Sequence, residues 1–353
     1  MNASPMTSLQ RVLTTLGHQE PDRVPCFLLV TMHGARALGM SIKDYFASSK
    51  TVVEGQLRMR ARYGHDCLYT FYYAPIEVEA WGGEVIYSDD GPPNSGEPFI
   101  GRIEDIARLE PPRVADCPCL AKVLRTTAEL KAQANGEAPI IGVVMSPFSL
   151  PVMQLGFERY LELMHERPAL FERLMRINEE FCVAWANAQL QAGATAICYF
   201  DPVSSSTIVP RDLYLKTGSV VAQRTLARIA GPTATHFASG RCQPILTDVS
   251  RTGTAVVGVS AEEDLSELKA ISRGKVTLLG NLNGIAMRHW TAAETEAEVK
   301  AAIRQAGAGG GFILSDNHGE IPWQVPEDVL MAIMDAVRTW GPYPLEGGGG
   351  HDA

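Results

Sequence analysis

The sequence contains no apolar run near the ~20 residues that a helix needs to cross a bilayer. Residues 1–25 also lack the long apolar segment of a secretory signal peptide. We therefore expect no membrane attachment, and the expected compartment is the cytoplasm.

Basic charge is also scarce. Lys and Arg together number 31 against 40 Asp and Glu, and the formal net charge is -9. A surface that binds nucleic acid needs an excess of cationic side chains to neutralise phosphates. The charge balance therefore argues against a nucleic-acid partner and against a role at the membrane surface.

The seven cysteines are an odd number and widely scattered, so they do not form a disulfide framework. Cys117 and Cys119 are separated by one residue, whereas common zinc knuckles separate theirs by two. Cys26, Cys67 and Cys198 lie in apolar runs, where a free cysteine behaves as a small core residue.

Eight short apolar runs, each followed by a helical pattern, are the main signal in the sequence. The runs are 24–30, 65–71, 139–145, 194–200, 233–238, 255–260, 276–282 and 311–316. The clearest helical stretches are 41–63, 167–191, 210–230, 261–272, 291–305 and 326–340. Near-continuous apolar runs that alternate with helices are typical of parallel strands buried on both faces.

Eight such units predict an α/β fold, a (β/α)8 TIM barrel formed as a single domain by residues 1–345. Residues 72–138, which contain Gly-Pro turn signals and one helical stretch, predict an insertion between the second and third strands. The glycine-rich tail, residues 346–353, is expected to be disordered.

Functional residues of such barrels come from the carboxyl ends of the strands and the loops that follow them. The polar residues at these positions are His33, Tyr72, Ser146, Asp201, His236, Asn281, His318 and Glu320. Of these, Asp201 follows its strand directly, where a carboxylate can act as a general base, bind a cation or orient a ligand. The alternative is that Asp201 is a turn or helix-capping residue.

His236 and His318 follow the fifth and eighth strands, and two imidazoles that face one cavity are typical ligands of zinc. Cys242 offers a thiolate nearby, and Glu320 offers a fourth ligand or an orienting carboxylate. The alternative is that each imidazole caps its strand end, and that Cys242 is a packing residue. Glycines 309–311 form an isolated cluster before a strand and are a weak nucleotide signature.

Several short segments, in their order and spacing, resemble the uroporphyrinogen decarboxylase family over nearly the whole chain. The segments are Arg11-Val12-Leu13, Pro21-Asp22-Arg23-Val24-Pro25, Ser146-Pro147-Phe148, Ala192-Gly193-Ala194, Asp201-Pro202, Gly280-Asn281-Leu282, His318-Gly319, Pro322 and Pro326. The resemblance implies one of two chemistries. One is cofactor-free decarboxylation of uroporphyrinogen, and the other is methyl transfer between a corrinoid and an acceptor whose thiol is activated by zinc.

The chain departs from both patterns. The arginine-rich segment of the decarboxylases is reduced to Arg36, which is too little positive charge for a substrate with eight carboxylates. The methyltransferases carry His-x-Cys after the fifth strand and a Cys after the eighth. Ala238 and His318 stand at those two cysteine positions.

We expect from this resemblance a corrinoid-dependent methyltransferase. Its zinc would be held by His236, Cys242 and His318, with Glu320 and Asp201 as catalytic groups. The residues expected to bind substrate are His33, Tyr72, Ser146 and Asn281. A methylcobamide on a separate corrinoid protein would exchange the methyl group with a thiol or tetrahydrofolate-type acceptor, and the resemblance also implies a homodimer.

Two alternatives remain open at this point. One is a metal-free decarboxylase, in which Asp201 stabilises a protonated pyrrole-like intermediate and His318 binds a carboxylate. The other is a binding protein that has kept the barrel and lost the chemistry.

Overall fold

Eight short strands form one parallel sheet in the computed structural model, which describes residues 6–345. The strands are β1 (Cys26–Phe27), β2 (Leu68–Tyr69), β5 (Ile140–Met145), β6 (Ala196–Phe200), β7 (Thr233–His236), β8 (Val256–Gly258), β9 (Thr277–Leu282) and β10 (Phe312–Asp316). Their order in the sheet is β1-β10-β9-β8-β7-β6-β5-β2. Each strand lies within one of the eight apolar runs, so the predicted barrel fold is confirmed.

The sheet curls until β1 and β2 lie beside each other, and one buried carboxylate helps to join them. The Asp66 amide donates to the Cys26 carbonyl at 2.8 Å, and the Cys26 amide donates to Asp66 Oδ2 at 2.9 Å. Arg11 and Arg23 pair with the same carboxylate at 2.6 and 2.7 Å. At this seam a side chain therefore accepts a hydrogen bond that a continuous sheet would direct to a backbone carbonyl.

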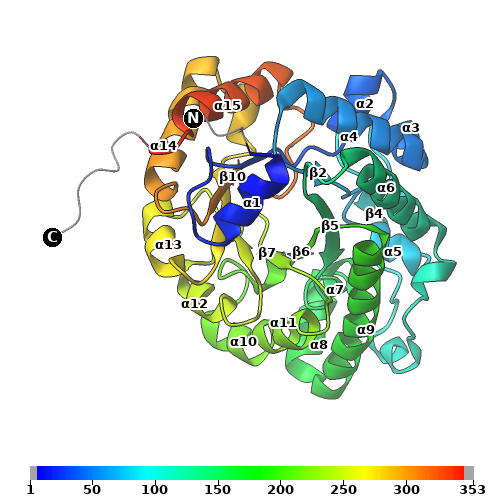
Figure 1. The fold of residues 1–353 in the computed structure, drawn as a ribbon. Coiled ribbons are helices and arrows are strands. Elements are labelled where there is room, and N and C mark those ends of the chain that lie inside the picture. Colours follow the sequence, from blue (N-terminus) through cyan, green and yellow to red (C-terminus); the bar gives the residue numbers. More distant parts are fainter. Residues whose placement is uncertain (1–5, 346–353) are drawn as a thin grey trace.

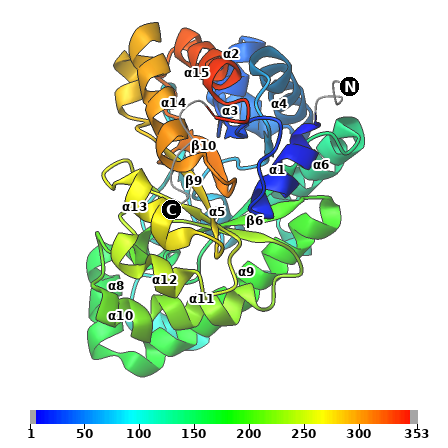
Figure 2. The same ribbon diagram turned by 60° about the vertical axis from the view of Figure 1, so that its left-hand side comes forward.

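Helices surround the strands in both views (Figure 1, Figure 2). They are α1 (Ser8–Leu16), α2 (His33–Leu38), α3 (Ile42–Ala47), α4 (Ser49–Tyr63), α5 (Ile76–Ala80), α6 (Pro118–Ala134), α7 (Pro151–Leu155), α8 (Phe157–Glu166), α9 (Pro168–Ala192), α10 (Arg211–Lys216), α11 (Gly218–Leu226), α12 (Leu246–Val249), α13 (Leu265–Ser272), α14 (Ala292–Ala306) and α15 (Glu327–Trp340). No helix within residues 6–345 is both long and apolar enough to span a membrane.

Two predicted helices are broken in the structure. The stretch 41–63 divides at Ser48, whose extended backbone ends α3 and whose hydroxyl caps α4 by accepting from the Lys50 amide at 3.2 Å. The stretch 210–230 divides at Thr217, which has a non-helical backbone. A serine that caps a helix and a serine inside one look alike in a periodicity pattern, which is why the sequence did not reveal the first break.

The insertion between the second and third barrel strands is present as predicted. It contains the antiparallel pair β3 (Val85–Ile86) and β4 (Asn94–Ser95), together with α5 and α6. The tail for which disorder was expected, residues 346–353, lies outside the described residues.

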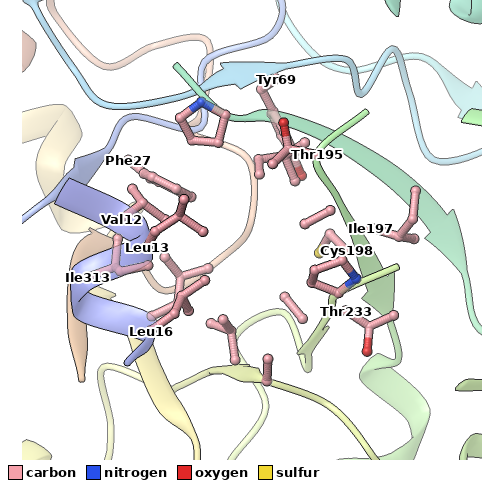
Figure 3. Close-up of a pocket in the computed structure, with 18 of the residues that line it drawn as sticks. Val12, Leu13, Leu16, Phe27, Tyr69, Thr195, Ile197, Cys198, Thr233 and Ile313 are labelled. Atoms are coloured by element: carbon pink, nitrogen blue, oxygen red, sulfur yellow. The ribbon is translucent and has the colours of Figure 1, made fainter. Parts of the chain in front are cut away.

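Helix α1 lies across the amino-terminal end of the barrel (Figure 1). Between α1 and the barrel interior lies a cavity of about 80 Å³, shown in Figure 3. Its walls are apolar and include Val12 and Leu16 of the helix and Phe27 and Ile313 of the strands. Because barrel enzymes carry their chemistry at the opposite end, this cavity is not the candidate active site.

Candidate active site

His236 is the last residue of β7, and the strand register sets it between Phe200 of β6 and Gly258 of β8. Its ring stacks on that of Phe200, with centroids 5.1 Å apart and planes inclined by 5°. A Cβ atom on Gly258 would lie 2.3 Å from Cδ2 of the imidazole. Glycine at this position therefore leaves the space that the ring occupies.

The protonation of His236 follows from its contacts. The Ala238 amide donates to Nδ1 at 3.0 Å, which leaves the ring proton on Nε2. Burial and, to a smaller extent, the charge of His318 lower the pKa of His236 to about 3. At neutral pH the group is thus an uncharged imidazole whose Nε2–H has no hydrogen-bond partner among the described residues.

His318 lies in the loop after β10, close enough for its charge to act on His236. Its side chain is exposed, and its Nδ1 lies 2.6 Å from the Ser239 hydroxyl. Asp316 shapes this loop, because its Oδ2 accepts from the amides of His318 and Gly319, both at 2.8 Å. The fold therefore brings together the two imidazoles that the sequence singled out.

A short series of hydrogen bonds links the loops around this end of the barrel. The Ser260 hydroxyl after β8 donates to the Ser239 carbonyl at 2.8 Å. The Asn281 amide group on β9 donates to the Ser260 carbonyl at 2.9 Å. Asn281 therefore supports the loop that carries Ser239, which in turn contacts His318.

Glu320 is a carboxyl group at this end whose pKa lies near neutrality. Burial raises its pKa to about 7, opposed by a hydrogen bond from the Thr31 hydroxyl and assisted by the charge of Asp316. A carboxyl group with a pKa near the working pH can both accept and release a proton.

The side chains of four other predicted residues lie apart from this group. Asp201 accepts hydrogen bonds from Ser146 at 2.5 Å and Ser149 at 2.7 Å, and only 1% of it is exposed. Its charge acts on Tyr160 and Tyr199, which pack on the helix side of the sheet. In the structure Asp201 and Ser146 therefore join the loops after β5 and β6.

Tyr72 and His33 are enclosed by other parts of the chain. The Tyr72 hydroxyl lies 2.7 Å from that of Thr126 on α6, and its ring packs on Phe46. His33 lies 6.0 Å from the Trp323 ring, and burial lowers its pKa to about 3.

The residues do not fit the zinc site that the sequence suggested. Cys242 is fully buried in the apolar cluster that contains Phe237 and Ile245, and burial raises the pKa of its thiol well above the ordinary value. The exposed nitrogen lone pair that a metal needs is absent from His236, because its Nε2 carries the proton while Nδ1 faces an amide. Within residues 6–345 no three His, Cys, Asp or Glu side chains are grouped to hold a metal.

Glu77 on α5 is a buried carboxyl group that the sequence reasoning missed. Its Oε1 accepts from the Met145 amide at 2.7 Å, and its Oε2 has no partner in the described chain. Burial raises its pKa to about 8, opposed by the Met145 hydrogen bond. The available signal was an acidic residue between two apolar ones, Ile76 and Val78, in the segment that follows β2.

Fold and site together define a (β/α)8-barrel protein with its titratable groups at the carboxyl ends of the strands. The chain matches the family described as uroporphyrinogen decarboxylase (URO-D) over residues 7–340, and it belongs to that family of enzymes.

The relatives include both decarboxylases and a methyltransferase. A uroporphyrinogen decarboxylase from Idiomarina loihiensis is 24% identical over 368 residues, covering 96% of this chain and 98% of that protein. A methylcobamide:CoM methyltransferase from Methanosarcina barkeri is 26% identical over 219 residues, covering 60% and 62%. Among solved structures, a methyltransferase from Methanosarcina mazei matches with a TM-score of 0.82 at 20% identity, covering 95% of this chain and 99% of that one. At that identity the structural match shows the fold alone.

Proposed function

We propose that the protein transfers a methyl group between a methylcobamide, carried by a separate corrinoid protein, and a small acceptor bound at the carboxyl end of the barrel. In this proposal the methylcobamide is a substrate that supplies the methyl group. The acceptor binds beside His236 and Glu320, and the groups that handle its proton belong to this chain.

The observation that carries the proposal is the pair of groups, His236 and Glu320, that the carboxyl end of the barrel contains. This end of the barrel offers a neutral N–H donor and a carboxyl group with a pKa of about 7. A proton-bearing acceptor must lose its proton as it gains the methyl group, and Glu320 is suited to accept that proton. The Nε2–H of His236 is suited to hold the acceptor atom in place.

Decarboxylation of a substrate with many carboxylates is less well supported, because the nearby guanidinium groups are already engaged. Arg36 donates to the carbonyls of Val325 and Trp323 and lies 4.2 Å over the Trp323 ring. Arg241, in the loop after β7, pairs with Glu262 at 2.8 Å. Neither offers the free bidentate fork with which arginine recognises a substrate carboxylate.

The test is a methyl-transfer assay of the purified protein with methylcobamide and three acceptors: coenzyme M, tetrahydrofolate and a small thiol. We expect methyl transfer to at least one of them, and at least a 100-fold loss in Glu320→Gln. Glu262→Gln is the matched control and should keep its activity, since within residues 6–345 the Glu262 side chain pairs with Arg241 alone. Release of CO2 from uroporphyrinogen, with no methyl transfer, would overturn the proposal.

A further inference from the structure

A second hollow lies at the amino-terminal end of the barrel, opposite the candidate active site. It has a volume of about 360 Å³ and is lined by the loop after α1, the end of α13 and the glycines that precede β10. Three basic side chains line it: those of His18, Lys269 and Arg273. The methyl-transfer proposal gives this region no role.

Lys269 is the least expected of the three, because only 8% of it is exposed. Its ammonium group donates to the Gly310 carbonyl, and no ion pair includes it within the described chain. Arg11, which is equally buried at this end of the barrel, pairs with both Asp22 and Asp66. A buried ammonium group without a counter-charge is costly, and proteins ordinarily pair it.

The other two basic side chains lie near the same ammonium group. Burial and, after it, the charge of Arg273 lower the pKa of Lys269 to about 8. Burial and the charge of Lys269 lower the pKa of His18, so its imidazole is uncharged at neutral pH. The repulsion between Lys269 and Arg273 favours an anion between them, and the neutral imidazole can donate a hydrogen bond to it.

The glycines that precede β10 explain how His18 and Lys269 can lie so close to the backbone of that segment. A Cβ atom on Gly311 would lie 2.5 Å from Nδ1 of His18 and 3.5 Å from Nζ of Lys269. A Cβ atom on Gly310 would lie 2.2 Å from the Gln19 carbonyl oxygen. Both glycines have positive φ, a conformation that favours glycine. Because they carry no Cβ atom, residues 18 and 19 can pack directly on the backbone of the run at 309–311.

We propose that this hollow binds a phosphate group, free or as part of a small phosphate monoester, between Lys269, His18 and Arg273. A tetrahedral dianion presents oxygens to Lys269, Arg273 and the His18 imidazole at once, and supplies the counter-charge that the buried ammonium group lacks. Glu20, on the loop that carries His18, accepts from the Gly309 amide at 2.9 Å and forms no ion pair with these cations within the described chain.

The test compares wild type with Lys269→Met, which keeps the length of the side chain and removes its charge. The measurements are isothermal titration calorimetry and thermal unfolding with inorganic phosphate, at constant ionic strength set with chloride. We expect phosphate to raise the wild-type Tm, and the Kd to weaken at least tenfold in Lys269→Met. Without phosphate, Lys269→Met should unfold at a higher temperature than wild type, because a buried charge has been removed.

Lys275→Met is the matched control, since Lys275 is exposed and six residues along the chain, and it should bind phosphate like wild type. His18→Gln provides a second variant at the site and should also weaken binding. Ribose 5-phosphate in place of inorganic phosphate separates a monoester site from a free-phosphate site. Absence of phosphate binding by wild type, or equal binding by Lys269→Met, would overturn the proposal.

Discussion

The backbone amide of Ala238 donates a hydrogen bond to Nδ1 of His236 at 3.0 Å. Ala238 reaches this position with a φ of 52°, a left-handed conformation that is uncommon for residues other than glycine. The contact fixes both the tautomer and the orientation of a fully buried imidazole. It also makes Nε2 of His236 a hydrogen-bond donor, which is a different role from that of a metal ligand.

The space around the His236 ring provides the first test. Gly258→Ala places a methyl group against the imidazole, so the ring must shift, and we expect at least a tenfold loss of methyl-transfer activity. Gly101→Ala is the matched control, because a Cβ there meets no atom within 4 Å. Equal activity of the two variants would show that the position of the His236 ring is unimportant.

Glu320 predicts the pH dependence of the reaction. Its pKa is raised to about 7, and as a base it works only when ionised. Wild-type kcat/KM should therefore fall as pH drops below about 7. The same profile measured on Glu320→Gln should be low and flat over this range, and a profile unchanged from wild type would remove Glu320 from the mechanism.

Glu77 predicts a pH dependence of stability. Its pKa rises from 4.5 to about 8 on folding, so the folded state favours the protonated form. This contribution is fully present below pH 4.5 and is lost as pH rises to about 8, for a total on the order of 5 kcal/mol. Glu77→Gln should therefore gain stability relative to wild type as pH rises from 5 to 8.

Urea unfolding at several pH values measures this difference. The exposed Glu298→Gln serves as control and should track wild type across the same range. A difference between Glu77→Gln and wild type that does not change with pH would contradict the expected burial of the carboxyl group.

At the seam between β1 and β2, we expect one small substitution to cause a large loss in the free energy of unfolding. Asp66→Asn keeps the shape of a fully buried side chain but removes the charge that pairs with Arg11 and Arg23. We expect a loss of about 3 kcal/mol in urea unfolding. Asp335→Asn, which removes an exposed pairing with Arg338, should cost less than about 1 kcal/mol.

We expect the Cys242 thiol to be unreactive toward alkylation in the folded protein. Its thiol is buried, and its raised pKa keeps it protonated at neutral pH. Iodoacetamide followed by peptide mass spectrometry should leave Cys242 unmodified in the folded protein and modify it after unfolding in urea. The zinc content of Cys242→Ala should equal that of wild type, and a drop in zinc would restore Cys242 as a ligand.

The barrel itself could be predicted because its signal is local. Strands buried on both faces need near-continuous apolar runs, and 233–238 and 276–282 show this without any knowledge of their partners. The placement of candidate residues at strand ends followed from the fold class alone. Such reasoning shows that a residue lies near the rim, but it does not show which way the side chain points.

That direction was decided by tertiary structure. Asp201 lies just after β6, and His236 is the last residue of β7. Because successive residues alternate between the two faces of a strand, the Asp201 side chain turns toward the helices, whereas the His236 ring turns into the barrel. The burial of Cys242 depends on packing against Phe237 and Ile245. The sequence by itself determined the strands, their number and their parallel arrangement, since each strand's apolar pattern is local. The tautomer of His236 depends on the left-handed backbone that Ala238 adopts in the folded chain. The pKa of Glu320 and the neighbours of Lys269 depend on residues distant in the chain, and only the folded structure brings those residues together.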